Sequence, residues 1–404
     1  MKKFLYFQPE YVSRFKCNGG ACNARCCKNW EITIDAAAYK KYSRIKPKNK
    51  AKEITSHFEY NESEEKYFLK ERSCPFLTEK NLCGLQLEYG EEFLSSTCAT
   101  YPRITRSFGK FFERALTLTC PVAAEMILFA QEPMKFDFVE VPDAIHSKHG
   151  KIYIQKFPTN ANAGDFFREA QVTMITILQE RRFTLDQRLI VLGSFINKLQ
   201  DLFLNESGIR DMLRLIGKYR LEKFLLEEMP PLFQNFSFDV KQFVTFMIKF
   251  IDHNMEFLNT AEGRKFLVAF EKVLGIKPNE NNQVSLKEIA ANFEKLSDAR
   301  KNFSKKYSPF LENYLVNELF SGVYPWRFRS YSLTKNFAVL LISYKIFELV
   351  TFAATESGLD SKEDLLALVD WFMTKTDHNT KLYERFFELL AGVDDTYLLM
   401  ATLL

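Results

Sequence analysis

Cysteine is absent from this 404-residue chain beyond Cys120, which confines thiol chemistry to the N-terminal part. Charge of one sign is also lacking, since a formal net charge of +4 gives no whole-protein argument for binding nucleic acid. No Gly-x-Gly-x-x-Gly sequence follows a predicted strand, so the usual Rossmann route to a nucleotide cofactor is not supported. The 47% of hydrophobic residues is ample for sizeable cores.

An export signal and a membrane span are missing as well. The apolar run Phe4–Phe7 is shorter than the roughly 7–15 residues that a signal peptide needs. The most apolar later stretch, Phe337–Ala354, contains Lys345 and Glu348, which predicts a buried helix rather than a membrane span. We therefore expect a cytoplasmic protein with no membrane or nucleic-acid partner.

Composition divides the chain into three parts. Residues 1–130 hold all the cysteines together with glycine, proline and charged residues, which predicts an irregular, cysteine-rich metal-binding domain. Residues 131–163 are rich in turn formers and predict a linker or excursion. Across residues 164–404 apolar side chains recur at helical spacing, which predicts a helical domain. The expected fold class is therefore mainly α.

The cysteines are the strongest chemical signal in the sequence. Four lie between Cys17 and Cys27, where two glycines in the first loop allow the tight bend that brings sulfurs together. Because disulfides are rare in the cytoplasm, the set predicts a metal or Fe-S site. Zinc stays an alternative from the spacing, and some members could be small buried side chains only. The predicted metal ligands are Cys17, Cys22, Cys26, Cys27, Cys74, Cys83, Cys98 and Cys120.

The cysteines stand within a series of longer motifs in the N-terminal part. They are Phe15-x-Cys17-x4-Cys22-x3-Cys26-Cys27-x2-Trp30, Cys74-Pro75-Phe76-Leu77, Leu82-Cys83, Gly90-Glu91-x2-Leu94-Ser95-x-Thr97-Cys98-x2-Tyr101-Pro102-Arg103 and Leu118-x-Cys120-Pro121-x-Ala123-Ala124. Less specific motifs follow at Leu178-Gln179-x-Arg181, Arg188-Leu189, Leu192-Gly193, Leu311-Glu312-Asn313-Tyr314-x2-Asn317 and Asp377-His378-Asn379. In this order the motifs resemble the flagellin lysine-N-methylase family, within the broader group of proteins with an iron- or zinc-chelating cysteine cluster.

The resemblance implies a methyltransferase that moves methyl groups from S-adenosylmethionine to surface lysines of flagellin, with a 4Fe-4S cluster in the N-terminal part. The Cys-x3-Cys-x2-Cys signature of radical enzymes is missing, because Cys27 follows Cys26 directly. We therefore expect a non-standard cofactor site. Polar and radical transfer both stay open.

Methyl transfer to lysine requires a neutral amine, whereas free lysine has a pKa of about 10.4. The site must therefore desolvate the amine or supply a base. Our candidate catalytic groups are Tyr101, Glu312 and His378. A lone histidine is, however, more often a hydrogen-bonded structural residue than a catalyst.

Arg103, Asn313 and Asn317 are the candidates for binding the cofactor. Arg103 lies five residues beyond Cys98, where its charge could stabilise an anionic cluster or bind a carboxylate, against the default of a surface ion pair. Asn313 and Asn317 are i,i+4 neighbours on one face of a predicted helix. Capping of a neighbouring loop is the ordinary role for such amides.

Two other classes of function stay open. The chain could be a non-enzymatic metal or redox sensor, or a metal-delivery protein, with a zinc or Fe-S site. It could also carry a zinc site that only folds a loop-rich segment. Affinity for S-adenosylmethionine would distinguish the methyltransferase from both.

Overall fold

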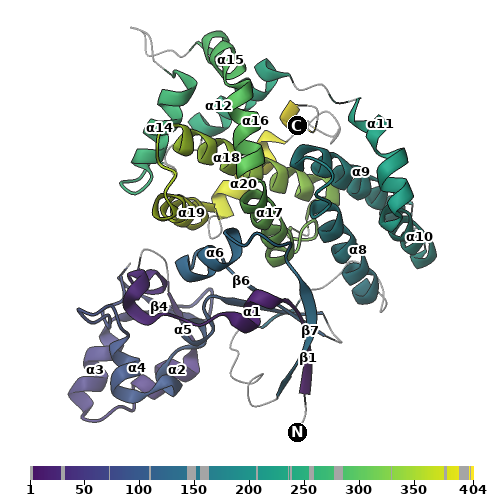
Figure 1. Ribbon diagram of the computed structural model, residues 1–404. Coiled ribbons are helices and arrows are strands. Elements are labelled where there is room, and N and C mark those ends of the chain that lie inside the picture. The colour runs from purple at the N-terminus through teal and green to yellow at the C-terminus, as the bar shows by residue number, and fades with distance from the viewer. Residues whose placement is uncertain are drawn as a thin grey trace. The chain divides into compact units, whose positions relative to one another are not determined.

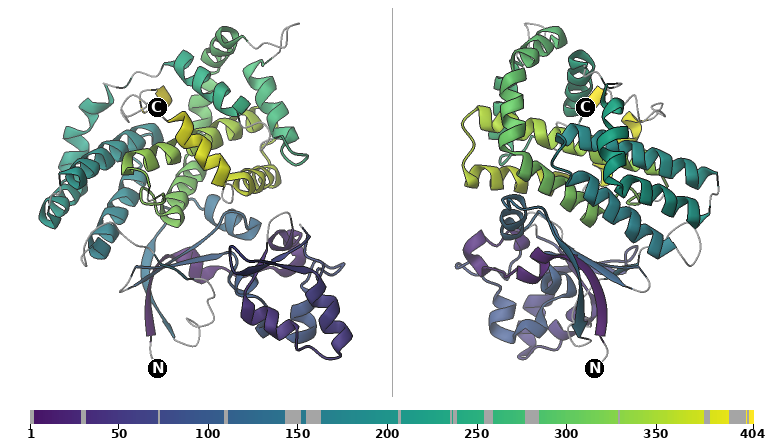
Figure 2. Two further views of the ribbon diagram at one scale, coloured as in Figure 1. Left: turned by 180° about the vertical axis from the view of Figure 1, so that it is seen from behind. Right: turned by 45° about the vertical axis from the view of Figure 1, so that its right-hand side comes forward.

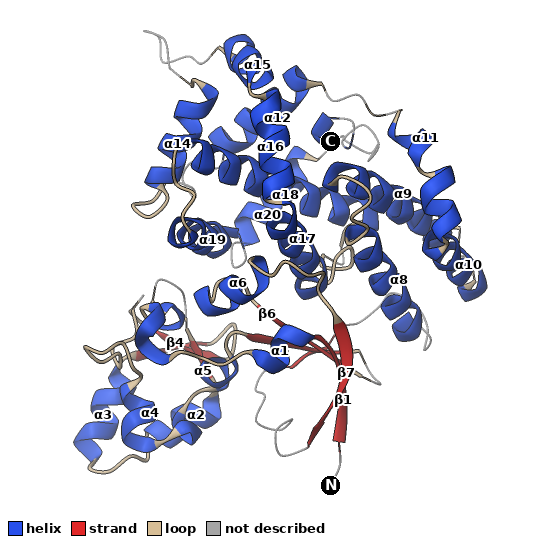
Figure 3. Cartoon of the chain, in the orientation of Figure 1, coloured by secondary structure: helices blue, strands red, loops and turns tan. Residues whose placement is uncertain are grey.

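The computed structural model describes residues 3–28, 32–71, 73–108, 111–142, 152–154, 163–205, 208–234, 236, 239–253, 259–276, 285–328, 330–376, 380–390, 400 and 402–404. The chain divides into two compact units (Figure 1). The first comprises Met1–Met126 and Met134–Lys156, and the second comprises Ile127–Pro133 and Phe157–Leu404. The named strands all belong to the first unit, as the red arrows of Figure 3 show.

A mixed five-stranded sheet forms one part of the first unit, in the order β7-β1-β6-β5-β8. β1 pairs parallel with β6 and antiparallel with β7, and β5 pairs antiparallel with β6. Aromatic side chains such as Tyr6 and Phe7 alternate between the two faces and are buried. The strands are β1 Lys3–Pro9, β5 Arg103–Ser107, β6 Phe112–Leu116, β7 Phe136–Pro142 and β8 Ile152–Ile154.

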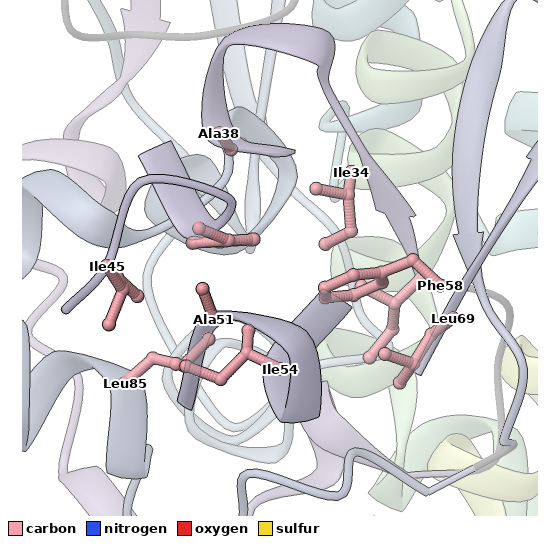
Figure 4. Close-up of a cluster of buried hydrophobic side chains, with 10 residues drawn as sticks. Ile34, Ala38, Ile45, Ala51, Ile54, Phe58, Leu69 and Leu85 are labelled. Atoms are coloured by element: carbon pink, nitrogen blue, oxygen red, sulfur yellow. The ribbon is translucent and has the colours of Figure 1, made fainter. Parts of the chain in front are cut away.

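A smaller subdomain of the first unit packs three helices against a three-stranded sheet, ordered β2-β4-β3. Its buried core is shown in Figure 4 and includes Ile34, Ile54, Phe58 and Leu85. The sheet strands are β2 Thr33–Ile34, β3 Phe58–Asn61 and β4 Lys66–Leu69. The helices are α2 Ala36–Tyr42, α3 Lys48–Ser56 and α4 Gly84–Tyr89.

Asp35 connects two segments of this subdomain through hydrogen bonds. Its carboxylate accepts a hydrogen bond from the Ala38 amide at 2.9 Å, which caps α2, and another from the Ser96 amide at 2.7 Å. Burial alone would raise the pKa of Asp35, but these backbone hydrogen bonds outweigh it and hold the pKa below its usual value. One charged side chain therefore joins α2 to the short helix α5, Ser96–Thr100.

Short helical segments carry or flank most of the cysteines. They are α1 Glu10–Arg14, η1 Gly19–Cys22, η2 Arg25–Cys27, η3 Glu91–Phe93, α5, and α6 Pro121–Leu128. The N-terminal part is thus less irregular than the sequence predicted. Sheets were overlooked because the strands are short and separated by loops, and because β7 and β8 come from the segment that was expected to be a linker.

The second unit is helical, which confirms that part of the predicted fold class. Its helices are α8 Ala163–Leu178, α9 Leu185–Leu204, α10 Ile209–Arg220, the π-helical turn η4 Phe224–Glu228, α11 Pro230–Phe233, α12 Val240–His253, α14 Arg264–Leu274, α15 Leu286–Lys295, α16 Ser297–Lys306, α17 Ser308–Gly322, α18 Leu333–Glu356, α19 Lys362–Thr376 and α20 Thr380–Leu389.

Helix α18 is the centre of the second unit. It contacts α9, α14, α17, α19 and α20, and the other helices surround it in Figure 2. Among the helices that the structure describes, α18 alone is long and apolar enough to cross a membrane. However, 94% of its most apolar 18-residue stretch is buried inside the protein. This burial matches the prediction of a core helix for Phe337–Ala354.

Candidate functional site

All eight cysteines line one cavity of about 490 Å³ in the first unit. All eight are free thiols, with no disulfide among them. The cavity is also lined by Arg25, Tyr42, Tyr101 and Arg103. The structure therefore brings cysteines that are up to a hundred residues apart in sequence to one place, as the metal-site hypothesis requires.

Three of these thiols are direct neighbours. The sulfurs of Cys26 and Cys27 are 3.8 Å apart, and the Cys74 amide donates to the Cys27 carbonyl at 2.8 Å. Hydrogen bonding from Cys27 lowers the pKa of Cys26 to about 7 and also lowers the pKa of Cys74. The same contacts raise the pKa of Cys27. These contacts thus favour the thiolate form at Cys26 and Cys74 over Cys27, and the thiolate is the form that binds metals.

Cys98 shows that the cavity lies inside the protein. Its side chain has solvent-accessible surface, yet burial raises its pKa to about 12. Surface exposure and a pKa raised by burial occur together where a sulfur is packed among protein atoms and faces a cavity. Burial likewise raises the pKa of Cys120 to about 11. Thiols at the wall of a cavity are the arrangement expected where a soft metal centre would bind.

The donor set fits an iron-sulfur cluster better than a single ion. Among the described residues, no three His, Cys, Asp or Glu side chains converge closely enough to hold one metal ion. A zinc ion would need its sulfurs at about 2.3 Å from one point. A four-iron cluster instead takes each cysteine at a different iron, so its sulfurs stand farther apart around a larger space.

Two predicted site residues lie with the cysteines. Arg103 begins β5, and its guanidinium carbon is 5.1 Å from the centre of the Phe15 ring. Burial lowers the pKa of Arg103, while the nearby Cys17 and Cys120 act in the opposite direction. The Tyr101 hydroxyl is 3.1 Å from the Thr119 hydroxyl. Arg103 thus places a partly buried positive charge in the cavity wall, beside two thiols.

Glu312, predicted as a catalytic group, is held in an ion cluster within the second unit. Its carboxylate is fully buried and accepts hydrogen bonds from Arg181 Nε at 3.1 Å and Nη2 at 2.9 Å. Arg188 Nη1 donates to the other carboxylate oxygen at 2.7 Å. Burial lowers the pKa of Arg188, and Glu312 opposes that effect. A carboxylate that compensates two guanidinium groups is poorly placed to accept a proton from a substrate.

Asn313 and Asn317 belong to the second unit, whereas the cysteine cavity belongs to the first. Asn313 and Asn317 are buried on α17 in the second unit, and Asn313 donates to the Ala130 carbonyl at 2.8 Å. That bond is the capping role expected as the ordinary alternative. His378 lies outside the described residues, and so does Trp30 of the first cysteine motif.

Arg25 and Tyr42 were not singled out from the sequence, although both line the cavity. Adjacency to Cys26 was the available signal for Arg25. Nothing local marks Tyr42, which reaches the cavity because α2 packs on the small sheet. Burial is the main cause that raises the pKa of Tyr42, and Cys98 and Asp35 add to it.

A second cavity of about 230 Å³ lies among the helices of the second unit. Lys345 reaches into it and stands 2.8 Å from both Asp186 and Glu348. Burial alone would lower the pKa of Lys345, but the two carboxylates outweigh it and raise the pKa. Arg300 also lines this cavity, and together with Lys345 it offsets the charges of the two carboxylates, which is typical of a structural ion network.

The chain therefore combines one unit that contains a cysteine-lined cavity with a second unit built from helices. The model of the FliB lysine N-methylase C-terminal domain matches residues 171–402, more than half of the chain. The chain belongs to this family, which is the family that the sequence motifs resemble. No solved structure matches it.

Curated relatives carry names from the same family. A lysine-N-methylase of Salmonella typhimurium is 31% identical over 134 residues, which are 32% of this chain and 33% of the relative. A flagellar biosynthetic protein FliU of Salmonella muenchen is 34% identical over 134 residues, or 32% of this chain and 79% of the relative. A lysine-N-methylase of Salmonella choleraesuis is 34% identical over 32% of this chain and 33% of its own length. The match thus spans about a third of the two lysine-N-methylases.

Proposed function

We propose that this protein is an S-adenosylmethionine-dependent methyltransferase that modifies lysine side chains of flagellin and carries a 4Fe-4S cluster in its first unit. The observation that carries the proposal is the cavity in which all eight cysteines meet Tyr101 and Arg103, in a chain of the lysine N-methylase family. Flagellin is supported as the substrate by the flagellar name of one relative.

The cysteines are the residues that would hold the cluster. Four sulfurs complete a four-iron cluster, and three leave one iron open, so eight thiols provide more ligands than one cluster needs. When bound, such a cluster supplies a metal centre at which an amino or carboxylate group of a ligand can coordinate. The surrounding protein orients the sulfurs and keeps bulk water away from them.

Arg103 is the residue we assign to the carboxylate of S-adenosylmethionine. A guanidinium binds a carboxylate through charge-assisted hydrogen bonds, which are strongest where water is excluded. Arg103 is partly buried in the cavity wall and lies beside Cys17 and Cys120. A cavity of about 490 Å³ falls within the range of small-ligand sites, which is about 300–1,000 Å³.

The substrate lysine must lose its proton before it can accept a methyl group. Burial beside a positive charge lowers the pKa of an amine, because both disfavour the ammonium form. Arg25 and Arg103 supply such charges at the cavity, so the ammonium group loses its proton to solvent as the lysine enters, and the Tyr101 hydroxyl can accept a hydrogen bond from the neutral amine. Glu312 is not part of this proposal, because two arginines already engage its carboxylate.

Calorimetric titration tests the proposal. S-adenosylmethionine is titrated into the anaerobically prepared, metal-loaded protein and into metal-free protein whose helical content is unchanged. We expect binding to the loaded form and an affinity at least about tenfold weaker, or ~1.4 kcal/mol, in the metal-free form. Equal affinity in the two folded forms would contradict a cofactor site at the cysteine cavity.

A metal or redox sensor without methyltransferase activity is the second candidate. The observation in its favour is Cys26, whose lowered pKa of about 7 gives a reactive thiolate at neutral pH. A sensor would bind metal in the cavity but show no affinity for S-adenosylmethionine, so the same titration separates the two functions.

A further inference from the structure

The eight cysteines fall into two groups that are attached to different parts of the first unit. One group is built onto the end of the five-stranded sheet, and the other onto the small subdomain. The grouping follows from strand topology, backbone hydrogen bonds and subdomain packing. It deepens the metal chemistry proposed above but does not depend on methyl transfer.

The first group gathers where two parallel strands end. β1 and β6 run parallel and pair through Tyr6 and Phe112, so their carboxyl ends lie at the same edge of the sheet. The chain continues from β1 through α1 to Cys17, and from β6 to Cys120. Arg103 starts β5 at this edge, where it pairs with Leu116 of β6.

Further contacts bind this first group together. The Gly19 amide donates to the Cys17 sulfur at 3.4 Å, and the Cys22 sulfur donates to the Gly19 carbonyl at 3.5 Å. The Arg103 guanidinium carbon lies 5.1 Å from the centre of the Phe15 ring, two residues before Cys17. Three sulfurs and one guanidinium therefore share this side of the cavity.

The second group belongs to the small subdomain. Cys27 and Cys74 are joined through a backbone hydrogen bond and the adjacent bridge between Lys28 and Ser73. A second bridge, between Leu77 and Cys83, closes the loop that follows Cys74. Cys74 and Cys83 both pack against the subdomain's hydrophobic core.

Cys98 joins the second group through α5. The Ser96 amide at the start of α5 donates to Asp35, and Thr97 is hydrogen-bonded to Thr33 of β2 at 3.0 Å. All five sulfurs of the second group are thus anchored to one framework.

A sharp reversal of the chain separates the groups. Asn23 and Ala24, between Cys22 and Cys26, both adopt left-handed backbone conformations, with φ of 57° and 49°. Such conformations are strained for residues other than glycine and persist where the surroundings hold them. Ala24 is also buried, so the reversal is fixed by packing.

We infer that the cavity has two separate sites for iron-sulfur clusters: an open one formed by Cys17, Cys22 and Cys120 beside Arg103, and a closed one formed by four of the five sulfurs of the small subdomain. Three protein ligands leave a coordination position for an exogenous ligand, whereas four protein sulfurs complete a site. The sulfurs of the second group are Cys26, Cys27, Cys74, Cys83 and Cys98.

Metal counting in paired variants tests this assignment. Iron, zinc and acid-labile sulfide are measured per chain in anaerobically purified full-length protein, together with Mössbauer spectra of iron-57-enriched samples. Cys17→Ser/Cys120→Ser removes two ligands of the open centre, and Cys74→Ser/Cys83→Ser removes two of the closed centre. Ala99→Ser is the matched control, because it adds a hydroxyl to the cavity wall without removing a sulfur.

We expect two distinguishable metal environments in the wild-type protein and in Ala99→Ser. Cys17→Ser/Cys120→Ser should lose one environment and keep the other at the wild-type amount, whereas Cys74→Ser/Cys83→Ser, which leaves three sulfurs in the second group, should keep the first environment and lose or alter the second. Loss of all metal from either folded double variant would contradict two centres, and so would full metal retention in the Cys17/Cys120 variant. If Cys74→Ser/Cys83→Ser fails to fold, a single environment in the wild-type spectrum would by itself overturn the inference. The metal counts are independent of methylation, so failure of either proposal is visible separately.

Discussion

Replacing Glu312 by glutamine should destabilise the helical unit strongly. The carboxylate of Glu312 is fully buried and compensates Arg188, whose side chain is only 3% exposed. Glutamine has nearly the same shape but no charge, so the Arg188 guanidinium stays buried without its counter-ion. Removing one partner of a buried ion pair costs about 3–5 kcal/mol. Glutamine keeps one acceptor oxygen, so we expect a loss near the lower end, about 3 kcal/mol.

The second arginine provides a graded comparison. Arg181 is 35% exposed and also bonds the Gln131 carbonyl, so its loss is cushioned by water. Arg181→Ala should therefore cost about 1 kcal/mol. Glu384→Gln, an exposed glutamate of α20, is the matched control and should change the stability by less than about 0.5 kcal/mol.

Urea denaturation followed by far-ultraviolet circular dichroism measures these free energies of unfolding. A double variant, Glu312→Leu/Arg188→Met, should be less destabilised than Glu312→Leu alone, because it removes the buried Arg188 charge together with its counter-ion and leaves only Arg181, which is 35% exposed to water. A loss below about 1 kcal/mol for Glu312→Gln would refute the structural role of the ion cluster and return Glu312 to the list of catalytic candidates.

Three further predictions concern other residues. The pKa of Asp35 is lower in the folded protein than its usual value. Its contribution to stability is therefore complete above the usual value and is lost as the pH falls below about 4. Asp35→Ala should cost about 1–2 kcal/mol at pH 7 and should weaken the loss of stability at acid pH, as measured by thermal unfolding. Gly193→Ala would place a Cβ against the Met400 sulfur, so it should cost about 1–3 kcal/mol and speed proteolysis of the C-terminal segment, as followed by intact-mass spectrometry. Arg103→Gln should weaken S-adenosylmethionine binding in calorimetry by about tenfold or more while leaving the bound metal unchanged; unchanged affinity would remove Arg103 from the cofactor site.

Helices were predictable because the apolar period is strong and the ends are marked. The stripe of leucines from Leu185 corresponds to α9, and the preceding break contains Thr184, which caps the helix in a capping box with Gln187. The five-stranded sheet was not predictable in the same way. Its parallel partners β1 and β6 are far apart in the sequence, and no local pattern specifies such a pairing.

The candidate site was predictable to the extent that cysteine type and clustering specify soft-metal chemistry. Tyr101 and Arg103 could be proposed from the sequence because they follow Cys98 closely. Both line the cavity, since β5 starts beside it. The ion pairs of Glu312 were not predictable, because its partners Arg181 and Arg188 come from distant positions and its charge compensation depends on tertiary packing. The assignments of catalytic and cofactor roles stay predictions.

Transfer of a labelled methyl group tests the central claim most directly. Flagellin is incubated anaerobically with metal-loaded protein and S-adenosylmethionine that carries an isotopically labelled methyl group, and the modified residues are located by mass spectrometry. The account predicts label on lysine side chains with the intact protein and none with folded Cys17→Ser/Cys120→Ser. Absence of label with the metal-loaded, folded protein would contradict it, and so would equal labelling by the double variant.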